Sequence, residues 1–159
     1  MSPSSSLQRA NWLALATPAA LLGGAYIGQY AFKLYPCEMC WWQRWPHFAA
    51  VGLAALAFVR PPRRILVMLA ALAILVSGLL GAYHAGVEWH WWEGLTTCST
   101  TAAAGGNPLD AIMKAPIIRC DVAQWRLLGV SLAGWNFLVS TGAALAIVAF
   151  LRRGERTAP

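Results

Sequence analysis

The sequence has few charged residues for its length. Only 11% of its 159 residues are Asp, Glu, Lys or Arg, while 58% are hydrophobic. A typical soluble domain is about 25% charged. This composition argues against a disordered chain or a soluble enzyme and is typical of a protein that crosses a membrane several times. The net charge of +6 forms no dense basic stripe, so nucleic acid is not an expected partner.

Long hydrophobic runs are present instead, uncharged except for Lys33 near the end of the first. A membrane-spanning helix needs about 20 mostly apolar residues, and three segments meet this need, residues 12–34, 65–86 and 127–151. A fourth run, residues 45–59, is too short to cross a bilayer alone, so we expect a helix over about 41–59 that begins near the cysteines before it. The sequence predicts an all-α, polytopic membrane four-helix bundle, with one integral membrane domain over residues 1–159.

The first hydrophobic run also resembles a secretory signal peptide in its position. It is longer than the roughly 7–15 apolar residues of a signal sequence, and no convincing cleavage site of small residues follows it. We therefore expect this run to remain as the first membrane helix.

The basic residues favour one orientation. At the two chain ends and in the turn between the second and third runs, a single acidic residue, Glu155, opposes the basic side chains of Arg9, Arg60, Arg63, Arg64, Arg152, Arg153 and Arg156. In and beside the other two loops, about residues 35–40 and 87–126, the charges balance five against five: Lys33, Arg44, Lys114, Arg119 and Arg126 against Glu38, Glu88, Glu93, Asp110 and Asp121. Basic residues stay on the cytoplasmic side of membrane proteins. Both termini are therefore expected in the cytoplasm and both of these loops outside it.

The four cysteines all fall in the two outer loops. Cys37 and Cys40 form a C-x-x-C motif, and Cys98 and Cys120 lie between the third and fourth runs. Thiols outside the cytoplasm meet oxidising conditions and pair. A disulfide across the second loop would be a useful structural staple, worth about 3 kcal/mol. A bridge across the C-x-x-C would close almost no loop, so redox chemistry explains this pair better.

A metal site is the alternative use of these cysteines. Four thiols, or two thiols with His84 and His90, would complete a tetrahedral zinc site. However, the second cysteine pair lacks the C-x-x-C spacing of zinc ligands. Trp41 follows Cys40 where a c-type haem attachment motif has histidine. We therefore expect redox cysteines and no metal.

Arg44 is a candidate binding residue. It lies four residues after Cys40, which places both on one face of a helix. Pro36 precedes Cys37 where this helix is expected to begin, and the free N–H groups of a helix N-terminus favour a thiolate. A guanidinium beside a thiol pair at the membrane stabilises a thiolate or donates to an anionic ligand oxygen. A plain interfacial anchor is the alternative role for Arg44.

The motif P-C-E-M-C-W-W-Q-R at residues 36–44 resembles that of disulfide bond formation protein B, DsbB, a family of bacterial inner-membrane thiol oxidases. Tyr83-His84 near the end of the third run, and Cys120 followed by Trp135-Asn136, extend the resemblance over nearly the whole chain. The resemblance implies a protein-disulfide:quinone oxidoreductase in the bacterial inner membrane, with redox cysteines that face the periplasm.

The resemblance also implies an electron relay. A reduced periplasmic thioredoxin-fold protein, DsbA-like, would attack the disulfide of the second cysteine pair. Electrons would then pass to the first pair and on to ubiquinone or menaquinone. The catalytic residues implied are Cys37, Cys40, Cys98 and Cys120. The residues implied to hold the quinone are Arg44 and His84.

Two other classes of protein remain open from the sequence. Thiol oxidases of the vitamin K epoxide reductase-like family are also four-helix and quinone-linked, but their quinone-proximal C-x-x-C belongs near a late helix, whereas here it opens the second. The other class is a non-enzymatic membrane protein in which the cysteines bind metal or form inert disulfides.

Overall fold

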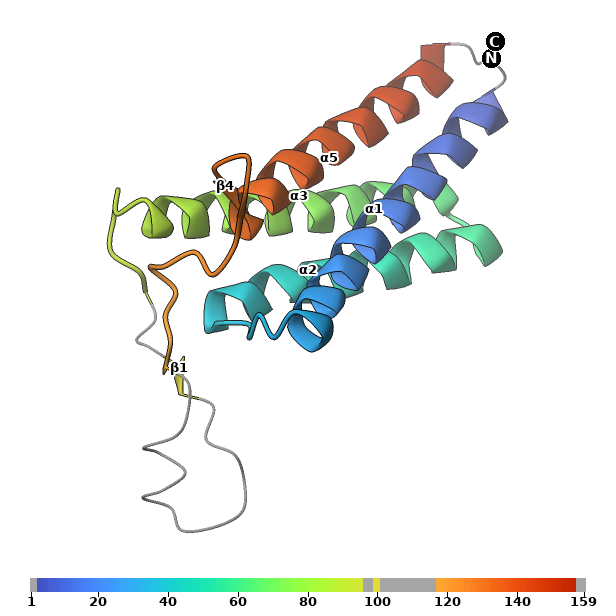
Figure 1. The fold of residues 1–159 in the computed structure, drawn as a ribbon. Helices are drawn as coiled ribbons and strands as arrows, with labels where there is room; N and C mark the ends of the chain where they lie inside the picture. The colour runs from blue at the N-terminus through green and yellow to red at the C-terminus, as the bar shows by residue number, and fades with distance from the viewer. Residues whose placement is uncertain (1–2, 96–98, 101–116, 157–159) are drawn as a thin grey trace.

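The computed structural model describes residues 3–95, 99–100 and 117–156. Within these ranges four long helices form the molecule: α1 (Pro3–Ala31), α2 (Glu38–Val59), α3 (Arg63–Glu88) and α5 (Leu132–Arg156). Two short antiparallel ribbons accompany them, β1 (Ser99–Thr100) with β2 (Ile117–Ile118), and β3 (Arg126–Leu127) with β4 (Val130–Ser131). The predicted fold class, an all-α four-helix bundle, is confirmed (Figure 1).

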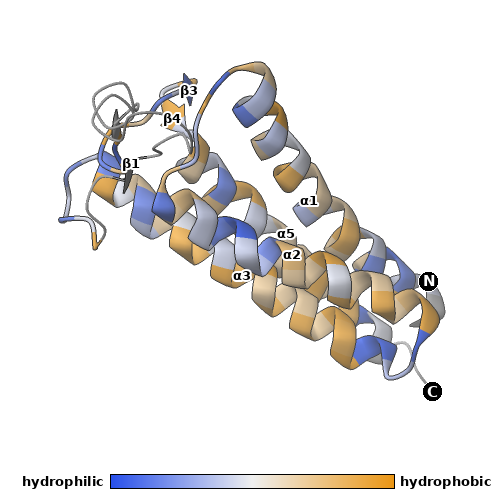
Figure 2. Cartoon of the chain, turned by 90° about the horizontal axis from the view of Figure 1, so that it is seen from below, coloured by the Kyte–Doolittle hydropathy of each residue, from blue (hydrophilic) through white to orange (hydrophobic). Residues whose placement is uncertain are grey.

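Each of the four helices packs mainly against two others, so that together they close into a bundle. α2 packs against α3, α3 against α5, and α1 against both α5 and α2. α1 begins and α5 ends at the same end of the bundle, and the ribbons lie at the other end (Figures 1 and 2). Alanines dominate the core nearest the termini, among them Ala10, Ala14, Ala50, Ala54 and Ala70. Such small side chains let membrane helices approach closely.

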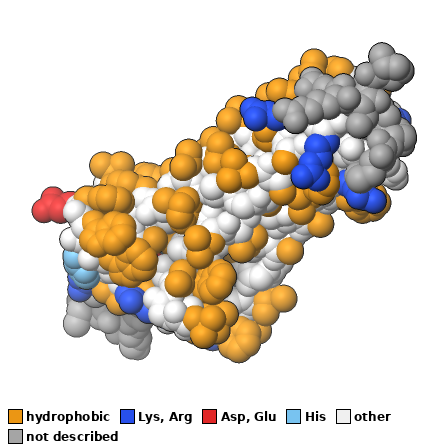
Figure 3. All heavy atoms as spheres, turned by 90° about the horizontal axis from the view of Figure 1, so that it is seen from above, with side chains coloured by type: hydrophobic (Ala, Val, Ile, Leu, Met, Phe, Trp, Pro, Cys, Tyr) orange, Lys and Arg blue, Asp and Glu red, His pale blue; other side chains and the backbone are white. Residues whose placement is uncertain are grey.

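Three of the helices are long and apolar enough to cross a membrane, over Ser5–Ala31, Arg63–Glu88 and Leu132–Gly154. Hydrophobic and uncharged side chains cover the middle of the face seen in Figure 3, and the charged ones lie toward its two ends. α2 is not among the three spans. Its apolar second half follows a first half that carries Glu38, Gln43, Arg44 and His47.

α2 begins at Glu38, earlier than the range of 41–59 expected from its hydrophobic run. Cys37 adopts an extended conformation, with φ −75° and ψ 175°, and its Sγ accepts a hydrogen bond of 3.3 Å from the backbone N–H of Cys40. This is the geometry of a helix N-cap, with sulfur in the place of the usual oxygen. Cys37, the first cysteine of the C-x-x-C motif, is therefore the cap of the helix that carries Cys40, the second.

The start of α5 differs from the prediction. The hydrophobic run predicted a helix from about residue 127, but α5 begins at Leu132. Before it, β3 and β4 form a hairpin whose two turn residues, Leu128 and Gly129, both have positive φ, 52° and 80°. Such a turn reverses the chain sharply. Ser131 then accepts a hydrogen bond of 3.2 Å from the N–H of Gly134 and so caps α5.

Other helix ends also differ from the predicted ranges. α1 begins at Pro3 rather than near residue 12, because the hydrophobic run marks only the apolar part of a longer helix. It ends at Ala31 rather than 34, since Lys33 has a φ of 59° that no helix continues. α3 extends two residues beyond the predicted 65–86 at each end.

Gly81 of α3 lies very close to α5. A Cβ at this position would lie 2.8 Å from the backbone oxygen of Ala133 and 3.1 Å from side-chain atoms of Asn136 and Gln43. A real Cβ does not approach backbone that closely, so the present distance between α3 and α5 requires glycine here.

Candidate functional site

A cavity of about 290 Å³ lies at the ribbon end of the bundle. Its α1 wall is made mainly of small or apolar residues, namely Ala20, Leu21, Leu22, Gly24, Ala25 and Gly28. Most of the polar and sulfur-bearing side chains that line it come from α2, α3, α5 and the segment before α2, namely Cys37, Cys40, Gln43, Arg44, His47, His84, Glu88 and Asn136. Arg119 and Gln124 line it from the segment between β2 and β3. A mostly apolar cavity with a few convergent polar groups is typical of a small-molecule site.

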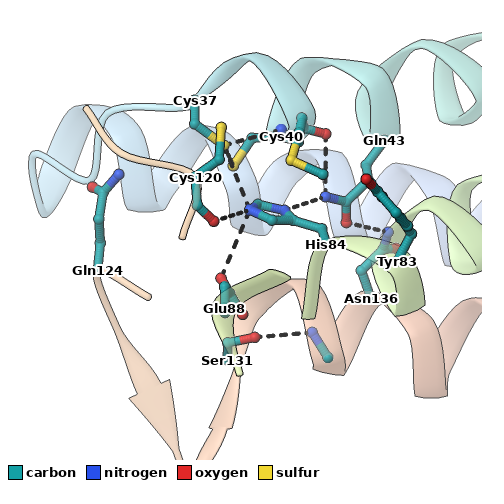
Figure 4. Close-up of polar contacts among 12 residues, drawn as sticks. Cys37, Cys40, Gln43, Tyr83, His84, Glu88, Cys120, Gln124, Ser131 and Asn136 are labelled. Carbon is teal, nitrogen blue, oxygen red and sulfur yellow. Dashed lines mark hydrogen bonds and ion pairs between the residues drawn. The ribbon is translucent and has the colours of Figure 1, made fainter. Parts of the chain in front are cut away.

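Three of the four cysteines meet at the edge of this cavity. The Sγ atoms of Cys37 and Cys40 lie 2.9 Å apart. The Sγ atoms of Cys37 and Cys120 and a ring nitrogen of His84 all lie within 4.8 Å of one another, and Figure 4 shows the sulfurs grouped above the His84 ring. Cys98, the fourth expected redox cysteine, lies outside the described residues. The arrangement brings a sulfur of the second cysteine pair to the first pair.

Cys37 is the most enclosed of these sulfurs, with 2% of its surface exposed. The Cys40 sulfur beside it, and then burial, raise the pKa of the Cys37 thiol above its ordinary value. The hydrogen bond from the Cys40 N–H acts in the opposite direction. The hydrogen bond from the helix end thus opposes the effects of the Cys40 sulfur and of burial on the Cys37 thiol.

His84 carries its proton on Nε2. The side-chain nitrogen of Gln43 lies 3.2 Å from the carbonyl oxygen of Met39 and 2.9 Å from Nδ1 of His84. A carbonyl oxygen only accepts, so this Gln43 atom is the NH₂ group, and Nδ1 must be an acceptor. Nε2 therefore bears the hydrogen, which explains its 3.1 Å contact with the carbonyl oxygen of Cys120. The same N–H lies 3.7 Å from Sγ of Cys37 (Figure 4).

This tautomer bears on the metal alternative. Among the described residues, the ligand-type side chains grouped closely enough for a metal are Cys37, His84 and Cys120, whereas His90 is exposed and outside the group. A metal at Nε2 of His84 would need the lone pair of that nitrogen. Since Gln43 holds the hydrogen on Nε2, the hydrogen bonds of the site disfavour metal binding.

Arg44 forms part of the cavity wall and is 6% exposed. Its Nη1 donates to Oε1 of Gln29 at 2.7 Å, and its Nη2 donates to the carbonyl oxygen of Ala25 at 3.4 Å. The guanidinium carbon lies 5.0 Å from the ring centre of Tyr26 and 4.8 Å from that of Trp41. All of these partners are uncharged, so they orient the positive charge of Arg44 without neutralising it.

A buried polar network continues from His84 into the bundle. Asn136 donates through Nδ2 to Oε1 of Gln43 at 2.8 Å and to the carbonyl oxygen of Ser77 at 3.1 Å. Its Oδ1 lies 2.9 Å from Nε2 of His47 and 2.9 Å from Oγ of Ser140. Buried polar groups are costly unless they are paired. The network pairs them and fixes the orientation of the Gln43 amide.

The segment around Cys120 is tied to the loop before α2. The side chain of Gln124 donates to the carbonyl oxygen of Tyr35 at 2.7 Å. On either side of Cys120, Arg119 and Asp121 form an ion pair with each other, and this guanidinium lowers the pKa of the Asp121 carboxyl. Cys120, between them, is buried in one cluster with Cys37.

The residues singled out from the sequence thus gather at one place: Cys37, Cys40, Arg44, His84 and Cys120 all lie in or beside the cavity. The sequence alone did not predict Gln43, His47 or Asn136 as members of the site. A signal was available, because Gln43 and His47 are polar residues one helical turn apart in a helix that was expected to cross the membrane.

Comparison with known proteins gives one consistent result. The family model of disulfide bond formation protein DsbB matches residues 8–150. Disulfide bond formation protein B of Verminephrobacter eiseniae is 31% identical over 92% of this chain and 86% of its own length. Disulfide bond formation protein B 2 of Pseudomonas aeruginosa is 29% identical over 89% of this chain and 92% of its own. No solved structure matches the chain.

Proposed function

The chain belongs to the disulfide bond formation protein DsbB family, and we propose that it oxidises the dithiol of a DsbA-like, thioredoxin-fold protein and passes the electrons to a membrane quinone. The family makes it a membrane protein of disulfide bond formation. The observation that carries the finer proposal is the shared cavity, which Cys37, Cys40 and Arg44 line together. A thiol pair and an unneutralised guanidinium thus border the same mostly apolar space.

The cysteines would act in two exchanges. A thiolate of the partner attacks the Cys98–Cys120 disulfide and forms a mixed disulfide with one of these cysteines. The partner's second thiol then attacks its own sulfur in this mixed disulfide, so the partner leaves with a disulfide and both loop cysteines are thiols. Cys120 next attacks Cys37, which breaks the Cys37–Cys40 bond and releases Cys40 as a thiolate. Cys98 then attacks Cys120, which restores the Cys98–Cys120 bond and leaves Cys37 and Cys40 reduced. The proximity of the Cys37 and Cys120 sulfurs supports this order.

The cavity fits a quinone headgroup by its chemistry. A bound quinone supplies an acceptor for the two electrons and two protons that the reduced Cys37–Cys40 pair gives up. Arg44 would donate to a headgroup oxygen, since its present partners are uncharged. His84 would donate from Nε2 toward the sulfur of Cys37 and so stabilise it as a thiolate. The apolar residues of α1 would exclude water from the thiol pair.

The location we propose is the bacterial inner membrane, with the cysteines facing the periplasm and both termini in the cytoplasm. The arginines near the termini support this orientation, because they gather at the end of the bundle opposite the cysteines. α2 would then be the fourth crossing, with its polar first half shielded from lipid by its neighbours. The buried state of Gln43, Arg44 and His47 supports such shielding.

The proposal is tested by anaerobic mixing of the purified protein with a reduced DsbA protein and decyl-ubiquinone, followed by quinone absorbance. We expect one quinone reduced for each DsbA disulfide formed. Cys40→Ser should abolish this turnover, while Gly52→Ala, at a position of α2 where no atom lies within 4 Å of a Cβ, should retain it. Normal turnover by Cys40→Ser would refute the mechanism, and no turnover by the unaltered chain would refute the function. Menadione in place of decyl-ubiquinone distinguishes the two classes of quinone.

A further inference from the structure

His47 is a buried residue of the cavity wall that the proposed relay does not use. It lies one helical turn after Gln43 on α2, lines the cavity and is 3% exposed. Its Nδ1 is buried and has no hydrogen-bond partner among the described residues. An unpaired polar atom in a site without water contact costs free energy unless a ligand or water completes it.

The hydrogen bonds of His47 determine what its Nδ1 offers. Asn136 must present Nδ2 to the carbonyl oxygen of Ser77, so its Oδ1 faces Nε2 of His47 and accepts. Ser77 donates its hydroxyl hydrogen to the carbonyl oxygen of Gln43 at 2.7 Å, so its Oγ also accepts from Nε2, at 2.9 Å. Nε2 therefore carries the hydrogen, and Nδ1 of the neutral ring holds a free lone pair.

A lone pair requires a donor, and this distinguishes the two redox forms of a quinone. The carbonyl oxygens of an oxidised quinone only accept, whereas the reduced form, a hydroquinone, carries O–H donors. We propose that Nδ1 of His47 accepts a hydrogen bond from a hydroxyl of the bound hydroquinone, so that the cavity binds the reduced headgroup more tightly than the oxidised one. This inference rests on the proposed function, since it assumes that the cavity is the quinone site.

The roles of His47 and Arg44 are then complementary. Arg44 is a permanent donor and serves either redox form, because quinone and hydroquinone oxygens both accept. The neutral ring of His47 accepts a hydrogen bond only from the hydroquinone, because only that form has O–H donors. Tighter binding of the reduced form raises the two-electron potential of the bound quinone by about 30 mV for each tenfold ratio of dissociation constants. His47 would thus make the bound quinone a stronger oxidant of the Cys37–Cys40 pair.

The test measures binding of both redox forms without turnover. The full chain with Cys40→Ser serves as the background, in detergent and without oxygen. Decyl-ubiquinone and decyl-ubiquinol are titrated separately, with quenching of tryptophan fluorescence as the readout, since Trp41 contacts Arg44 in the cavity wall. The measured quantity is the ratio of the two dissociation constants within each variant, which a general loss of folded protein does not change.

His47→Gln is the main variant, because its terminal NH₂ keeps a donor for Asn136 and Ser77 but leaves a methylene in place of Nδ1. We expect it to weaken decyl-ubiquinol binding about tenfold and decyl-ubiquinone binding less than about twofold. His47→Asn, which keeps a polar atom near the Nδ1 position, should retain the unaltered ratio more closely. Ser140→Ala, which removes a network hydroxyl but not Nδ1, should leave the ratio unchanged.

The inference and the proposed function fail in different ways. Saturable binding of both probes with a ratio that His47→Gln leaves unchanged would overturn the inference alone, and would mean that water satisfies Nδ1. An equal change of the ratio in Ser140→Ala would overturn it too, since the effect would then come from the network. Absence of saturable binding of either probe in the Cys40→Ser background would contradict the quinone site itself.

Discussion

The side-chain NH₂ of Gln43 donates a hydrogen bond of 2.9 Å to Nδ1 of His84. This one contact decides which ring nitrogen faces the sulfurs with a hydrogen and which faces away with a lone pair. Asn136 holds the other end of the Gln43 amide, so a residue on α5 sets the protonation pattern of a histidine on α3 through a residue on α2. The geometry of the proposed redox site therefore depends on the packing of three helices.

The first prediction concerns Gln43→Glu. A glutamate carboxylate accepts but does not donate, so it would move the His84 hydrogen to Nδ1 and leave the Nε2 lone pair toward Cys37 and Cys120. The reduced protein should then bind Cd²⁺ at least about tenfold more tightly than the unaltered chain. The measurement is the sulfur-to-metal charge-transfer absorbance during a Cd²⁺ titration. Gln43→Leu is the control and should show no such gain. Equal Cd²⁺ affinity in all three proteins would contradict the tautomer assignment.

The second prediction concerns Arg44. Arg44→Ala should raise the quinone KM about tenfold or more with a smaller effect on kcat, because it removes a charged donor that binds the headgroup before and after electron transfer. The quinone KM of Arg44→Lys should lie between those of Arg44→Ala and the unaltered chain. An ammonium keeps the charge but does not bridge Gln29 and Ala25 as the guanidinium does. Steady-state kinetics over a range of decyl-ubiquinone concentrations give both constants. A purely kcat effect in Arg44→Ala would exclude a binding role.

The third prediction concerns the close approach of α3 and α5. Gly81→Ala should destabilise the protein by about 1–3 kcal/mol, because the new methyl group would overlap the Ala133 backbone and disturb the Gln43–Asn136 hydrogen bond. Thermal unfolding in detergent, followed by circular dichroism, measures the loss as a lower Tm. Gly52→Ala on α2 is the matched control, since no atom lies within 4 Å of a Cβ there. A Tm for Gly81→Ala at or above that of the control would contradict this prediction. It would show that α3 and α5 can move apart to admit the methyl group with no loss in the free energy of unfolding.

The fourth prediction concerns the tie between the two loops. Gln124→Ala removes the hydrogen bond to the carbonyl oxygen of Tyr35, so the Cys120 segment should spend less time against Cys37. When the reduced protein is treated with diamide, the rate at which the Cys37–Cys120 disulfide forms should fall several-fold. This is the effect expected from the loss of one hydrogen bond worth about 0.5–1.5 kcal/mol. Mass spectrometry of quenched peptides follows the product. Gln8→Ala, at the far end of α1, should react like the unaltered chain.

Parts of this architecture follow directly from the sequence. Uncharged runs identify α1, α3 and α5, because crossing a bilayer demands length and apolarity. The spacing of Cys40 and Arg44 places both beside the cavity, since one helical turn separates them. The predicted start of α5 was wrong, because hydropathy does not distinguish an apolar hairpin from a helix. Leu127 and Val130 of the hairpin are as apolar as the residues that follow.

The polar network was not foreseen for a different reason. Which of Gln43, Ser77, His47 and Asn136 meet depends on how three helices are rotated and shifted against one another. That relation comes from close packing at residues such as Gly81, and it has no local signal in the chain. The partners of Arg44 on α1 follow the same rule, since Gln29 and Ala25 are set by the contact between α1 and α2.

Cys37 caps α2, and the reactive role that we propose for the same sulfur would link the chemistry to the order of the backbone. While Cys37 is a thiol, its sulfur accepts the N–H of Cys40. When the same sulfur joins Cys120, its lone pairs reorient and that acceptor weakens, so the first turn of α2 loses its cap. Deuterium uptake at the amide of Cys40 would then report the state of Cys37, fast while its sulfur is bonded to Cys120 and slow while it is a thiol.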